Sequence, residues 1–542
     1  MTRRKGILVM LLGVIAVWIA ANILFDVQPE RPDAQDAKEQ LGPYHDDMSL
    51  RETFESFPES GPGAAELRLL RDNELAWAAR WDLLDKAQRS IDVSYFILRQ
   101  DIFGVAFLAH LLKKPQDGVQ VRVLLDAFGS RLSWHPKGND YLDTLVNTGN
   151  VEVRMYRPLR QRIAEGLLHL NPVVALASEH DKILVVDGER AITGGRNIGV
   201  EYFSHPADAE FVFQDVEVEI KHRPTAAALI AAFEAQYGAE DADRIMRERL
   251  DIQSQADDLE WAYGAMTAWL RGEPLPDHAQ GTPPGPRAGW ADELREMQRL
   301  KGSLAKALPD YLGAETRVLD SVTRFNDTED GISRGATRLV ESARREIFIQ
   351  SPYLVLTEPA VKVFARASQR GVPITILTNS PASSDSDVSQ AFFLEQWPHL
   401  VARIPSLRLY GNGADQKIHA KVASFDKVLS LVGTYNLSPE SMALNSEVMV
   451  AVWSRDFADK LTKNPRARLA AGEPKTYRYR IARDRDGTPQ RDEDGELIVE
   501  FGPEDHTDVE NMTKLQAYRK SLEAADKLPG VSPYFIDDYR PE

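Results

Sequence analysis

Two short segments of the chain carry the same polar and glycine residues at the same spacing. Residues 179–197 read EHDKILVVDGERAITGGRN, and residues 418–436 read IHAKVASFDKVLSLVGTYN. Five matching positions are His180, Lys182, Asp187, Gly194 and Asn197 in the first segment, and His419, Lys421, Asp426, Gly433 and Asn436 in the second. A chance match at five positions is improbable, so one chemical cluster is present twice in this chain.

Each segment is typical of a β-hairpin. Alternation along a strand places the histidine and the lysine on one face and the aspartate on the other. Asp187 begins a turn dipeptide between two apolar runs, so we expect a structural role for it and for Asp426. The returning strand then ends at glycine or threonine residues that share this structural role: Gly194, Gly195, Gly433 and Thr434.

The end of each returning strand brings Asn197 or Asn436 back beside the histidine and the lysine. An imidazole, an ammonium and an amide on one face suit a phosphoryl group, because the lysine and the asparagine can bind its non-bridging oxygens. Displacement at phosphorus through a covalent intermediate needs a nucleophile and a proton donor. Two facing domains would supply one histidine each.

Each imidazole also requires a carboxylate that holds its tautomer. Two acidic residues in strand-like runs after the asparagines are the candidates. They are Asp215 in FQDVEVEI and Glu447 in LNSEVMV.

The segments around the two motifs repeat as well. Residues 74–98 predict an amphipathic helix followed by a buried strand, and residues 336–356 have the same pattern about 250 positions later. GVQVRVLLDA and GVPITILTNS are a second matching pair, each typical of a strand. Alternating helices and strands predict an α/β fold, and the constant offset indicates an internal duplication of one domain.

The chain therefore divides into six predicted parts. They are a membrane anchor at 1–25, an acidic Pro-rich tether at 26–63, a first domain at 64–223, a helical insertion and linker at 224–310, a second domain at 311–455, and an acidic C-terminal extension at 456–542.

The N-terminus predicts a location at a membrane. Arg3, Arg4 and Lys5 precede an uncharged stretch over residues 6–25, and twenty helical residues span about 30 Å. A cleaved signal peptide is the alternative, but its apolar region is usually about 7–15 residues. Cations before the stretch and acidic residues after it predict a single-pass protein with its catalytic region outside the cytoplasm.

Composition limits the partners. A net charge of −17 argues against a generic nucleic-acid binder, and the absence of cysteine excludes disulfides and thiolate metal sites. No histidines or carboxylates have metal-ligand spacing, so we expect neither a metal nor another cofactor.

The paired motifs resemble those of the phospholipase D superfamily, and residues 64–455 are most similar to its bacterial cardiolipin synthases. Further supporting strings are SIDVSYFILRQDIFG, GGRNIGVEYF, IQSPYLVL, TNSPASSD and GTYNLSPESMALNSE. The resemblance implies two pseudosymmetric domains with mixed sheets flanked by helices, and one metal-independent active site between them that a monomer completes. It also implies that His180 is the nucleophile, that His419 is the general acid and then base, and that Asp215 and Glu447 orient them.

The leading hypothesis from this resemblance is a phosphatidyltransferase of the bacterial inner membrane, with its catalytic region on the periplasmic side. It would make cardiolipin from phosphatidylglycerol and a second phospholipid, which is either another phosphatidylglycerol or phosphatidylethanolamine. Alternatives are a hydrolase of the same fold that releases phosphatidic acid, a nuclease, and an inactive lipid-binding scaffold.

The sequence departs from the resemblance beside the first histidine and in the second motif. Glu179 and Asp181 flank His180, and two anions there would weaken attraction for an anionic headgroup. Thr434 replaces a serine or glycine, and because it keeps a hydroxyl we expect little effect.

Three other segments have open interpretations. GGRNIG superficially resembles a dinucleotide loop, but it lacks the βαβ context. Residues 167–177 predict a core helix or an acyl-chain contact. The arginines of RMYRPLRQR predict lipid phosphate binding or a solvated loop. They are Arg154, Arg157, Arg160 and Arg162.

Overall fold

The computed structural model describes most of the chain between residues 47 and 526. The described ranges are 47–130, 140–148, 151–158, 161–163, 177–209, 211–239, 242–244, 253–276, 286–324, 327–473 and 475–526. Within them, helices alternate with the strands of a large mixed sheet, and the predicted α/β fold is confirmed.

Eight strands form the half of the sheet that belongs to the first repeat. They are β1 (Ala65–Leu70), β2 (Ser90–Tyr95), β3 (Gln120–Asp126), β4 (Val151–Tyr156), β5 (Lys182–Val186), β6 (Arg190–Gly194), β8 (Glu217–Lys221) and β9 (Ala242–Arg244). Their order is β9–β4–β3–β2–β5–β6–β8–β1, in which β2, β3 and β4 are parallel and the other neighbours are antiparallel.

The second repeat has the same strand order and the same directions. Its strands are β10 (Leu312–Arg324), β11 (Asp327–Asp330), β12 (Ile347–Gln350), β13 (Ile374–Asn379), β14 (Leu407–Asn412), β16 (Lys421–Phe425), β17 (Leu429–Gly433), β18 (Glu447–Trp453) and β19 (Thr476–Arg478). They run β19–β14–β13–β12–β16–β17–β18–β10, and β11 pairs antiparallel with the end of β10. β1 pairs with β10, so the two halves form one sheet.

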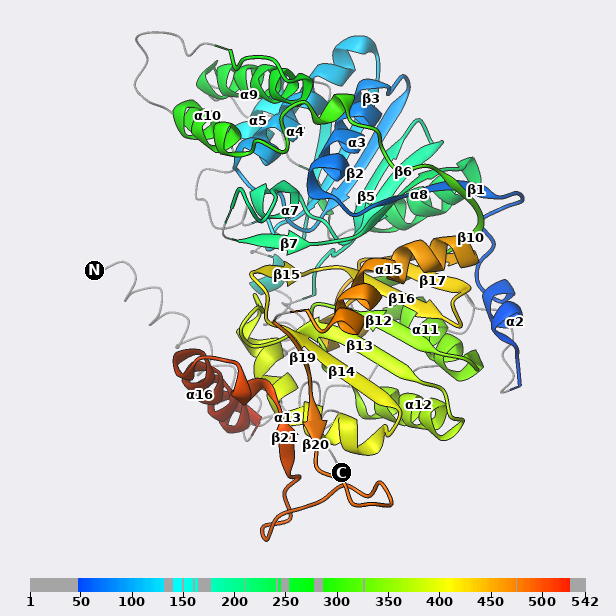
Figure 1. Cartoon of the computed structure of the whole chain (residues 1–542). Coiled ribbons are helices and arrows are strands. Elements are labelled where there is room, and N and C mark those ends of the chain that lie inside the picture. Colours follow the sequence, from blue (N-terminus) through cyan, green and yellow to red (C-terminus); the bar gives the residue numbers. More distant parts are fainter. Residues whose placement is uncertain are drawn as a thin grey trace, which may run out of the picture.

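The helices lie on the outer faces of the repeats and between them (Figure 1). The bounds are α2 (Leu50–Glu55), α3 (Asn73–Asp85), α4 (Ile102–Lys113), α5 (Asp140–Thr148), α7 (Val200–Phe203), α8 (Arg223–Tyr237), α9 (Gln253–Arg271), α10 (Pro286–Glu296), α11 (Gly331–Ser342), α12 (Glu358–Gln369), α13 (Asp387–Arg403), α14 (Pro439–Ala443), α15 (Arg455–Ala471) and α16 (Val509–Asp526).

Equivalent helices in the two repeats begin with the same cap. The Asp101 side chain accepts a hydrogen bond from the backbone N–H of Gly104 at the start of α4, and Thr357 accepts one from Ala360 at the start of α12. Such caps satisfy backbone donors that have no partner in the first helical turn. The duplication therefore includes the local signals that start the helices.

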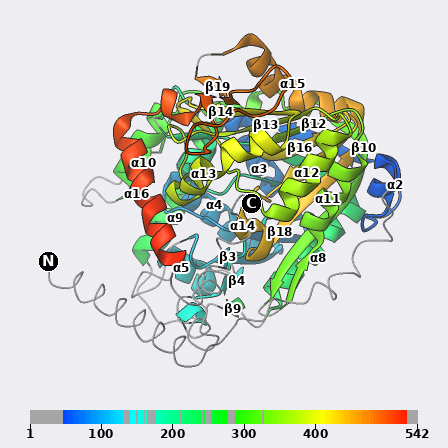
Figure 2. The same cartoon turned by 90° about the horizontal axis from the view of Figure 1, so that it is seen from below.

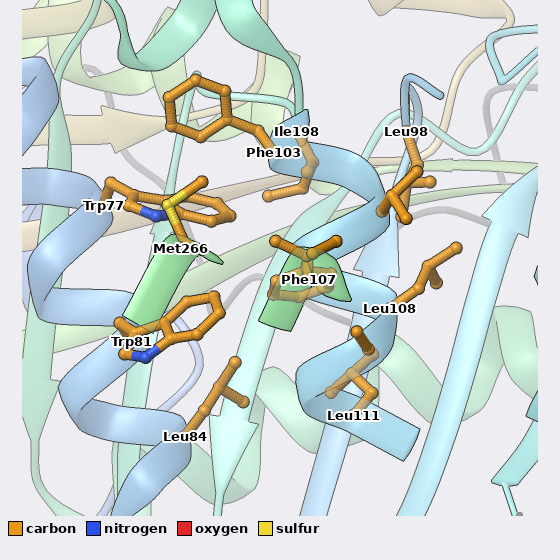
Figure 3. Close-up of a cluster of buried hydrophobic side chains, with 14 of the residues drawn as sticks. Trp77, Trp81, Leu84, Leu98, Phe103, Phe107, Leu108, Leu111, Ile198 and Met266 are labelled. Carbon is orange, nitrogen blue, oxygen red and sulfur yellow. The ribbon is translucent and has the colours of Figure 1, made fainter. Parts of the chain in front are cut away.

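Three hydrophobic clusters stabilise the described structure. One lies between the first half-sheet and its helices, where Trp77, Trp81, Phe103 and Phe107 pack with Met266 of α9 (Figure 3). A second occupies the equivalent layer of the second repeat. The third joins the inner faces of the two half-sheets with α8 and α15, so the repeats share a core.

Residues 26–63 are not wholly a tether. Within the part of this segment that the structure describes, α2 has a capping box made by Ser49 and Glu52. Leu50, Phe54 and Phe57 are buried in the cluster of the second repeat. The prolines and acidic residues of the segment favoured the prediction of a tether. The helix is buried against residues of the second repeat, far along the chain, so the local sequence does not predict it.

The C-terminal extension is also joined to the second repeat. α15 contributes Phe457 and Leu461 to the shared core, and β19 adds an edge strand to β14. A small hairpin follows, formed by β20 (Arg480–Ile481) and β21 (Val499–Phe501), and α16 then packs along α13 (Figure 2). The domain boundaries themselves stay predictions.

The anchor at 1–25 lies outside the described residues. Across the part of the chain that the structure does describe, no helix is both long and apolar enough to cross a membrane.

Candidate active site

Each of the two histidines lies against the opposite repeat, because its backbone N–H is hydrogen-bonded to a residue of that repeat. His180 and His419 stand just before β5 and β16, the central strands of the two half-sheets. The N–H of His180 donates to the carbonyl oxygen of Ser446, and the N–H of His419 donates to that of Gln214. The second contact belongs to a two-stranded parallel ribbon of β7 (Val212–Gln214) and β15 (Gln416–Ile418), seen at the junction in Figure 1.

This pairing places each histidine beside a carboxylate of the other repeat. Ser446 and Gln214 directly precede Glu447 and Asp215 in the sequence. Nδ1 of His180 lies 2.9 Å from Oε2 of Glu447, and Nδ1 of His419 lies 2.6 Å from Oδ2 of Asp215. A hydrogen bond donated by Nδ1 leaves the Nε2 lone pair free to react. Sequence analysis identified both carboxylates but did not assign the crossed pairing.

The two lysines lie within the same cluster. Lys182 Nζ donates to the carbonyl oxygen of His180 at 2.6 Å, and Lys421 Nζ lies 3.0 Å from Nε2 of His419. Both side chains are buried. They place cationic groups next to the two histidines, as a site for a phosphodiester would require.

The asparagines are held differently in the two repeats. The Asn197 side chain accepts from the N–H of Ile97 and donates to the hydroxyl of Tyr202, each at 3.0 Å. Oδ1 of Asn436 is buried and has no hydrogen-bond partner among the described residues. The Asn436 side-chain oxygen is therefore able to accept a further hydrogen bond at the site.

The glycine and threonine positions of the motifs contact the carboxylates. A Cβ added to Gly195 would lie 2.1 Å from Oδ1 of Asp215, so only glycine leaves room there. At the equivalent position of the second motif, the hydroxyl of Thr434 donates to Glu447. Sequence analysis missed the hydroxyl of Ser441, which also donates to Glu447. The repeat gives no signal for this contact, because Tyr202, at the equivalent position of the first repeat, is hydrogen-bonded to Asn197 instead.

Asp187 and Asp426 lie away from the histidines, in matching turns. The Asp187 carboxylate accepts hydrogen bonds from the N–H groups of residues 88–90, and that of Asp426 accepts from residues 344–346. Both have positive φ, 58° and 54°. These contacts attach each hairpin turn to the loop before β2 or β12.

Burial and charge set the protonation of the histidines. Burial, followed by the positive charges of Lys182 and Lys421, holds the pKa of His180 well below its usual value. Burial and Lys421 also lower the pKa of His419, although Asp215 opposes them. His180 is therefore neutral at pH 7 and has a lone pair for attack.

The two carboxylates differ in charge. Burial raises the pKa of Glu447 to about 8, against the influence of Lys182. Burial also disfavours the anion of Asp215, but His419 and Lys421 outweigh it and lower its pKa. Burial lowers the pKa of Lys182 to about 8 and that of Lys421 to about 7. The site therefore favours a proton on His419, beside an ionised carboxylate, more than one on His180.

The acidic residues that flank His180 do not present two anions to a headgroup. Glu179 and Asp181 are both buried, and burial raises the pKa of Glu179 to about 8 and that of Asp181 well above its usual value. The Glu179 side chain accepts a hydrogen bond from Ser94. At neutral pH the raised pKa values disfavour the two anions on which the predicted repulsion depends, and the lipid preference itself stays a prediction.

The basic segment RMYRPLRQR is not a solvated loop where it is described. Arg157 and Arg162 are buried and donate to the carbonyl oxygen of Ala177, and Arg162 also pairs with Asp126. Arg154 donates to the carbonyl oxygen of Tyr237. These arginines stabilise the fold, whereas Arg160 and residues 167–176 lie outside the described residues.

No set of three or more potential metal ligands occurs among the residues that the structure describes. Independence from metals and other cofactors stays a prediction.

Comparison with known proteins places this geometry in a family. The family described as "Cardiolipin synthase, PLD-like domain" matches residues 81–235 and 337–467, which is more than half of the chain. The chain belongs to this family. Its membership in the phospholipase D superfamily is thereby confirmed, and each matched range contains one of the two histidine motifs.

Individual relatives agree with this placement. The chain is 28% identical to cardiolipin synthase C of Escherichia coli (strain K12) over 429 residues, covering 74% of this chain and 84% of that protein. It is 25% identical to cardiolipin synthase A of Pseudomonas aeruginosa (strain LESB58), covering 77% and 72%. The crystal structure of phosphatidylserine synthase from Haemophilus influenzae Rd KW20 has the same fold, with a TM-score of 0.53, 13% identity, and coverage of 89% of this chain and 99% of that one.

Proposed function

We propose that this protein is a phospholipase D-type phosphatidyltransferase that makes cardiolipin. The observation that carries the proposal is the crossed pair of buried histidine–carboxylate contacts, His180 with Glu447 and His419 with Asp215. The names of the relatives support cardiolipin as the product.

The first half-reaction forms a covalent intermediate. Nε2 of neutral His180 attacks the phosphorus of a donor phospholipid, and the bond from phosphorus to the headgroup oxygen breaks. Protonated His419 gives its proton to that oxygen, so the headgroup alcohol leaves neutral. Ionised Asp215 supports the imidazolium of His419, whereas Glu447, with its raised pKa, holds His180 without favouring its protonation.

The second half-reaction uses the same groups in reverse. His419 takes the proton from a hydroxyl of phosphatidylglycerol, whose oxygen attacks phosphorus and releases His180. Lys182 and Lys421 bind the non-bridging oxygens in both steps. Water at about 55 M competes, but a bound and oriented alcohol acts at an effective molarity of about 10⁵ M or more. Transfer therefore dominates wherever the acceptor is positioned.

Lipid products test the reaction. Purified full-length protein in phosphatidylglycerol vesicles, with or without phosphatidylethanolamine, should yield cardiolipin as the main product and phosphatidic acid as a minor one. Phosphatidic acid and free headgroup as main products under every acceptor condition would identify a hydrolase instead.

Covalent trapping tests the assignment of roles. His180→Ala and His419→Ala should each abolish turnover, because the two groups act in series. The unaltered protein, reacted with a lipid that carries labelled phosphorus and quenched without acid, should carry the label on His180 and none on His419. Label on His419 in the unaltered protein would reverse the two roles.

Activity should survive EDTA, and a loss of activity that added metal restores would overturn the metal-free mechanism.

We also propose a single-pass location at the bacterial inner membrane, with the catalytic region on the periplasmic side. The charge difference across residues 6–25 supports this orientation. A reporter that is active only outside the cytoplasm should be active after fusion to Glu542. Protease added to spheroplasts should digest the catalytic region, whereas protection there and cleavage in inverted vesicles would place it in the cytoplasm.

A further inference from the structure

A cavity of about 110 Å³ lies in the second repeat, between its sheet and the helices α11 and α12. Most of the lining side chains are apolar. They include Ile332, Val340, Ile349, Val363, Phe364 and Met449. Lys421 of the active site lines the same cavity, together with Ala423 and Phe425.

The cavity extends away from the active site along β16. Lys421, Ala423 and Phe425 alternate along this strand and therefore lie on one face. The four residue steps from Lys421 to Phe425 span about 13 Å. One end of this wall is therefore the lysine that contacts His419, and the other end lies deep beneath the helices.

In the part of the first repeat that the structure describes, large side chains occupy the equivalent layer (Figure 3). Asp101 and Thr357, the caps of α4 and α12, are 256 residues apart, as are the loops that Asp187 and Asp426 bind. When core positions of the two repeats are compared at this offset, four large residues of the first repeat correspond to smaller residues in the second. Trp77, Trp81, Tyr95 and Phe107 correspond to Ser333, Thr337, Ser351 and Val363.

The polar residues among these replacements do not make the cavity hydrophilic. The hydroxyl of Ser333 is hydrogen-bonded to that of Tyr435. The hydroxyl of Ser351 donates to the carbonyl oxygen of Tyr353 at 2.8 Å. Since these two hydroxyls bond within the protein, an apolar ligand would not deprive them of a partner. An apolar cavity of about 150 Å³ in another protein stays dry and binds benzene, so this cavity can take a hydrocarbon segment.

We propose that this cavity binds a segment of one acyl chain of the phospholipid substrate. The inference rests on the proposed function, in which the phosphodiester of that lipid lies between His180 and His419. Lys421 joins the two regions, because its ammonium lies at the phosphodiester site while the residue also lines the cavity. The polar and apolar parts of one lipid would therefore occupy two adjoining spaces of matching chemistry.

Filling the cavity tests the proposal. In Val363→Phe, the phenyl group that the first repeat carries as Phe107 would occupy the space. Lys362→Phe is the matched control, because Lys362 is the neighbouring residue on α12 and its side chain is 55% exposed. Both variants and the unaltered protein would be assayed with dihexanoyl- and dioleoyl-phosphatidylglycerol in the same detergent micelles.

We expect Val363→Phe to lower kcat/KM for the dioleoyl lipid by about tenfold, the effect of no longer burying two methylene groups. Its kcat/KM for the dihexanoyl lipid should change by less than about twofold, and Lys362→Phe should affect neither. The fluorescent fatty acid cis-parinaric acid should bind to the unaltered protein and to Lys362→Phe but not to Val363→Phe. Thermal unfolding of each variant establishes that it folds.

Two results would overturn the inference. One is a Val363→Phe protein that folds and uses both lipids as well as the unaltered protein does, which would make the cavity a packing defect. The other is unchanged binding of cis-parinaric acid. Absence of any transfer by the unaltered protein would instead refute the proposed function, and the binding measurement would still decide whether the cavity accepts an acyl chain.

Discussion

At the scale of single residues, the two halves of the site are similar in arrangement but unequal in charge. Each histidine contacts a buried carboxylate, yet the pKa of Glu447 is raised to about 8 and that of Asp215 is lowered. The difference follows from surroundings, since His419, Lys421 and Arg196 all favour the anion of Asp215. A duplicated motif can therefore supply an acid and a nucleophile from the same residue type.

The lysines predict an activity that declines in alkaline solution. Lys421 and Lys182 have pKa values of about 7 and about 8, so their cations are present below these pH values and are lost as the pH rises through them. The pKa of His180 lies well below 6.5, so the nucleophile stays neutral at pH 6.5. Since kcat/KM reports the free enzyme, it should fall by roughly tenfold per pH unit above about pH 7, where Lys421 loses its cation, and more steeply above about pH 8, where Lys182 loses its cation as well.

A pH profile of kcat/KM on short-chain phosphatidylglycerol measures this decline. Thermal unfolding at each pH is the control for loss of structure. An optimum above pH 9 would contradict the assigned role of the lysines.

Substitutions at the equivalent positions Gly195 and Thr434 should impair the site to different degrees. Gly195→Ala places a methyl group against Asp215, and displacement of that carboxylate should lower kcat/KM by roughly 100-fold. Thr434→Ala removes one hydrogen bond to Glu447 and should cost roughly tenfold. Steady-state kinetics with unfolding curves measures both.

Two controls accompany these variants. Thr434→Ser keeps the hydroxyl and should retain activity. Gly264→Ala adds a methyl group where nothing lies within 4 Å, and it should change neither stability nor rate adversely. Equal activity of Gly195→Ala and Gly264→Ala would show that Asp215 tolerates displacement.

At the scale of elements, the turn after the central strand of each repeat is attached to the loop before a neighbouring strand. Asp187 and Asp426 make this attachment through three backbone N–H groups each. Both residues have positive φ, a conformation that aspartate and asparagine adopt more readily than most residues. Their place in the motif therefore reflects the position of β5 and β16 in the sheet.

Asp187→Ala and Asp426→Ala should reduce stability more than catalysis. Each removes the acceptor of three backbone donors and should lower the free energy of unfolding by about 2 kcal/mol. Below the unfolding temperature, kcat should stay within about twofold of the unaltered value. Asp187→Asn retains one acceptor and the favoured conformation, so its loss should be smaller. Full stability with lost activity would instead place the aspartate in the chemistry.

At the scale of the whole molecule, neither repeat contains a complete histidine–carboxylate pair. Glu447 belongs to the repeat opposite His180, and Asp215 to the repeat opposite His419. The β1–β10 pairing, the β7–β15 ribbon and the shared core hold the repeats together. Both histidine–carboxylate contacts are therefore made within one chain, and we propose that a monomer completes the site.

Mixing inactive variants tests this self-sufficiency. Equimolar His180→Ala and His419→Ala proteins should recover no activity in phosphatidylglycerol vesicles, because exchange of repeats would require the shared core to open. Co-refolding the same two variants from denaturant is the comparison. Rapid recovery on mixing native proteins would indicate a site shared between chains.

The sequence by itself determined the duplication, the α/β class and the histidines, lysines and carboxylates that the structure brings together at the candidate site. Spacing identified His180 and His419 with their lysines. Two segments with the same internal spacing are expected to have the same backbone conformation, so the same residues meet in each. The alternation of side chains along a strand predicted that Asp187 lies on the opposite face from His180, because the face of a side chain depends only on its position in the strand. The burial of Phe54, by contrast, depends on a partner in the second repeat, so local composition suggested a tether instead.

Only the tertiary structure decided which carboxylate meets which histidine and which charges the site carries. The crossed pairing results from backbone hydrogen bonds between segments more than 200 residues apart, which no local pattern encodes. Glu179 and Asp181 were interpreted as anions from their type, but their pKa values depend on burial. The cavity beside Lys421 likewise results from small side chains on several elements. Burial and packing are sums over distant neighbours, and they exist only once the chain is folded.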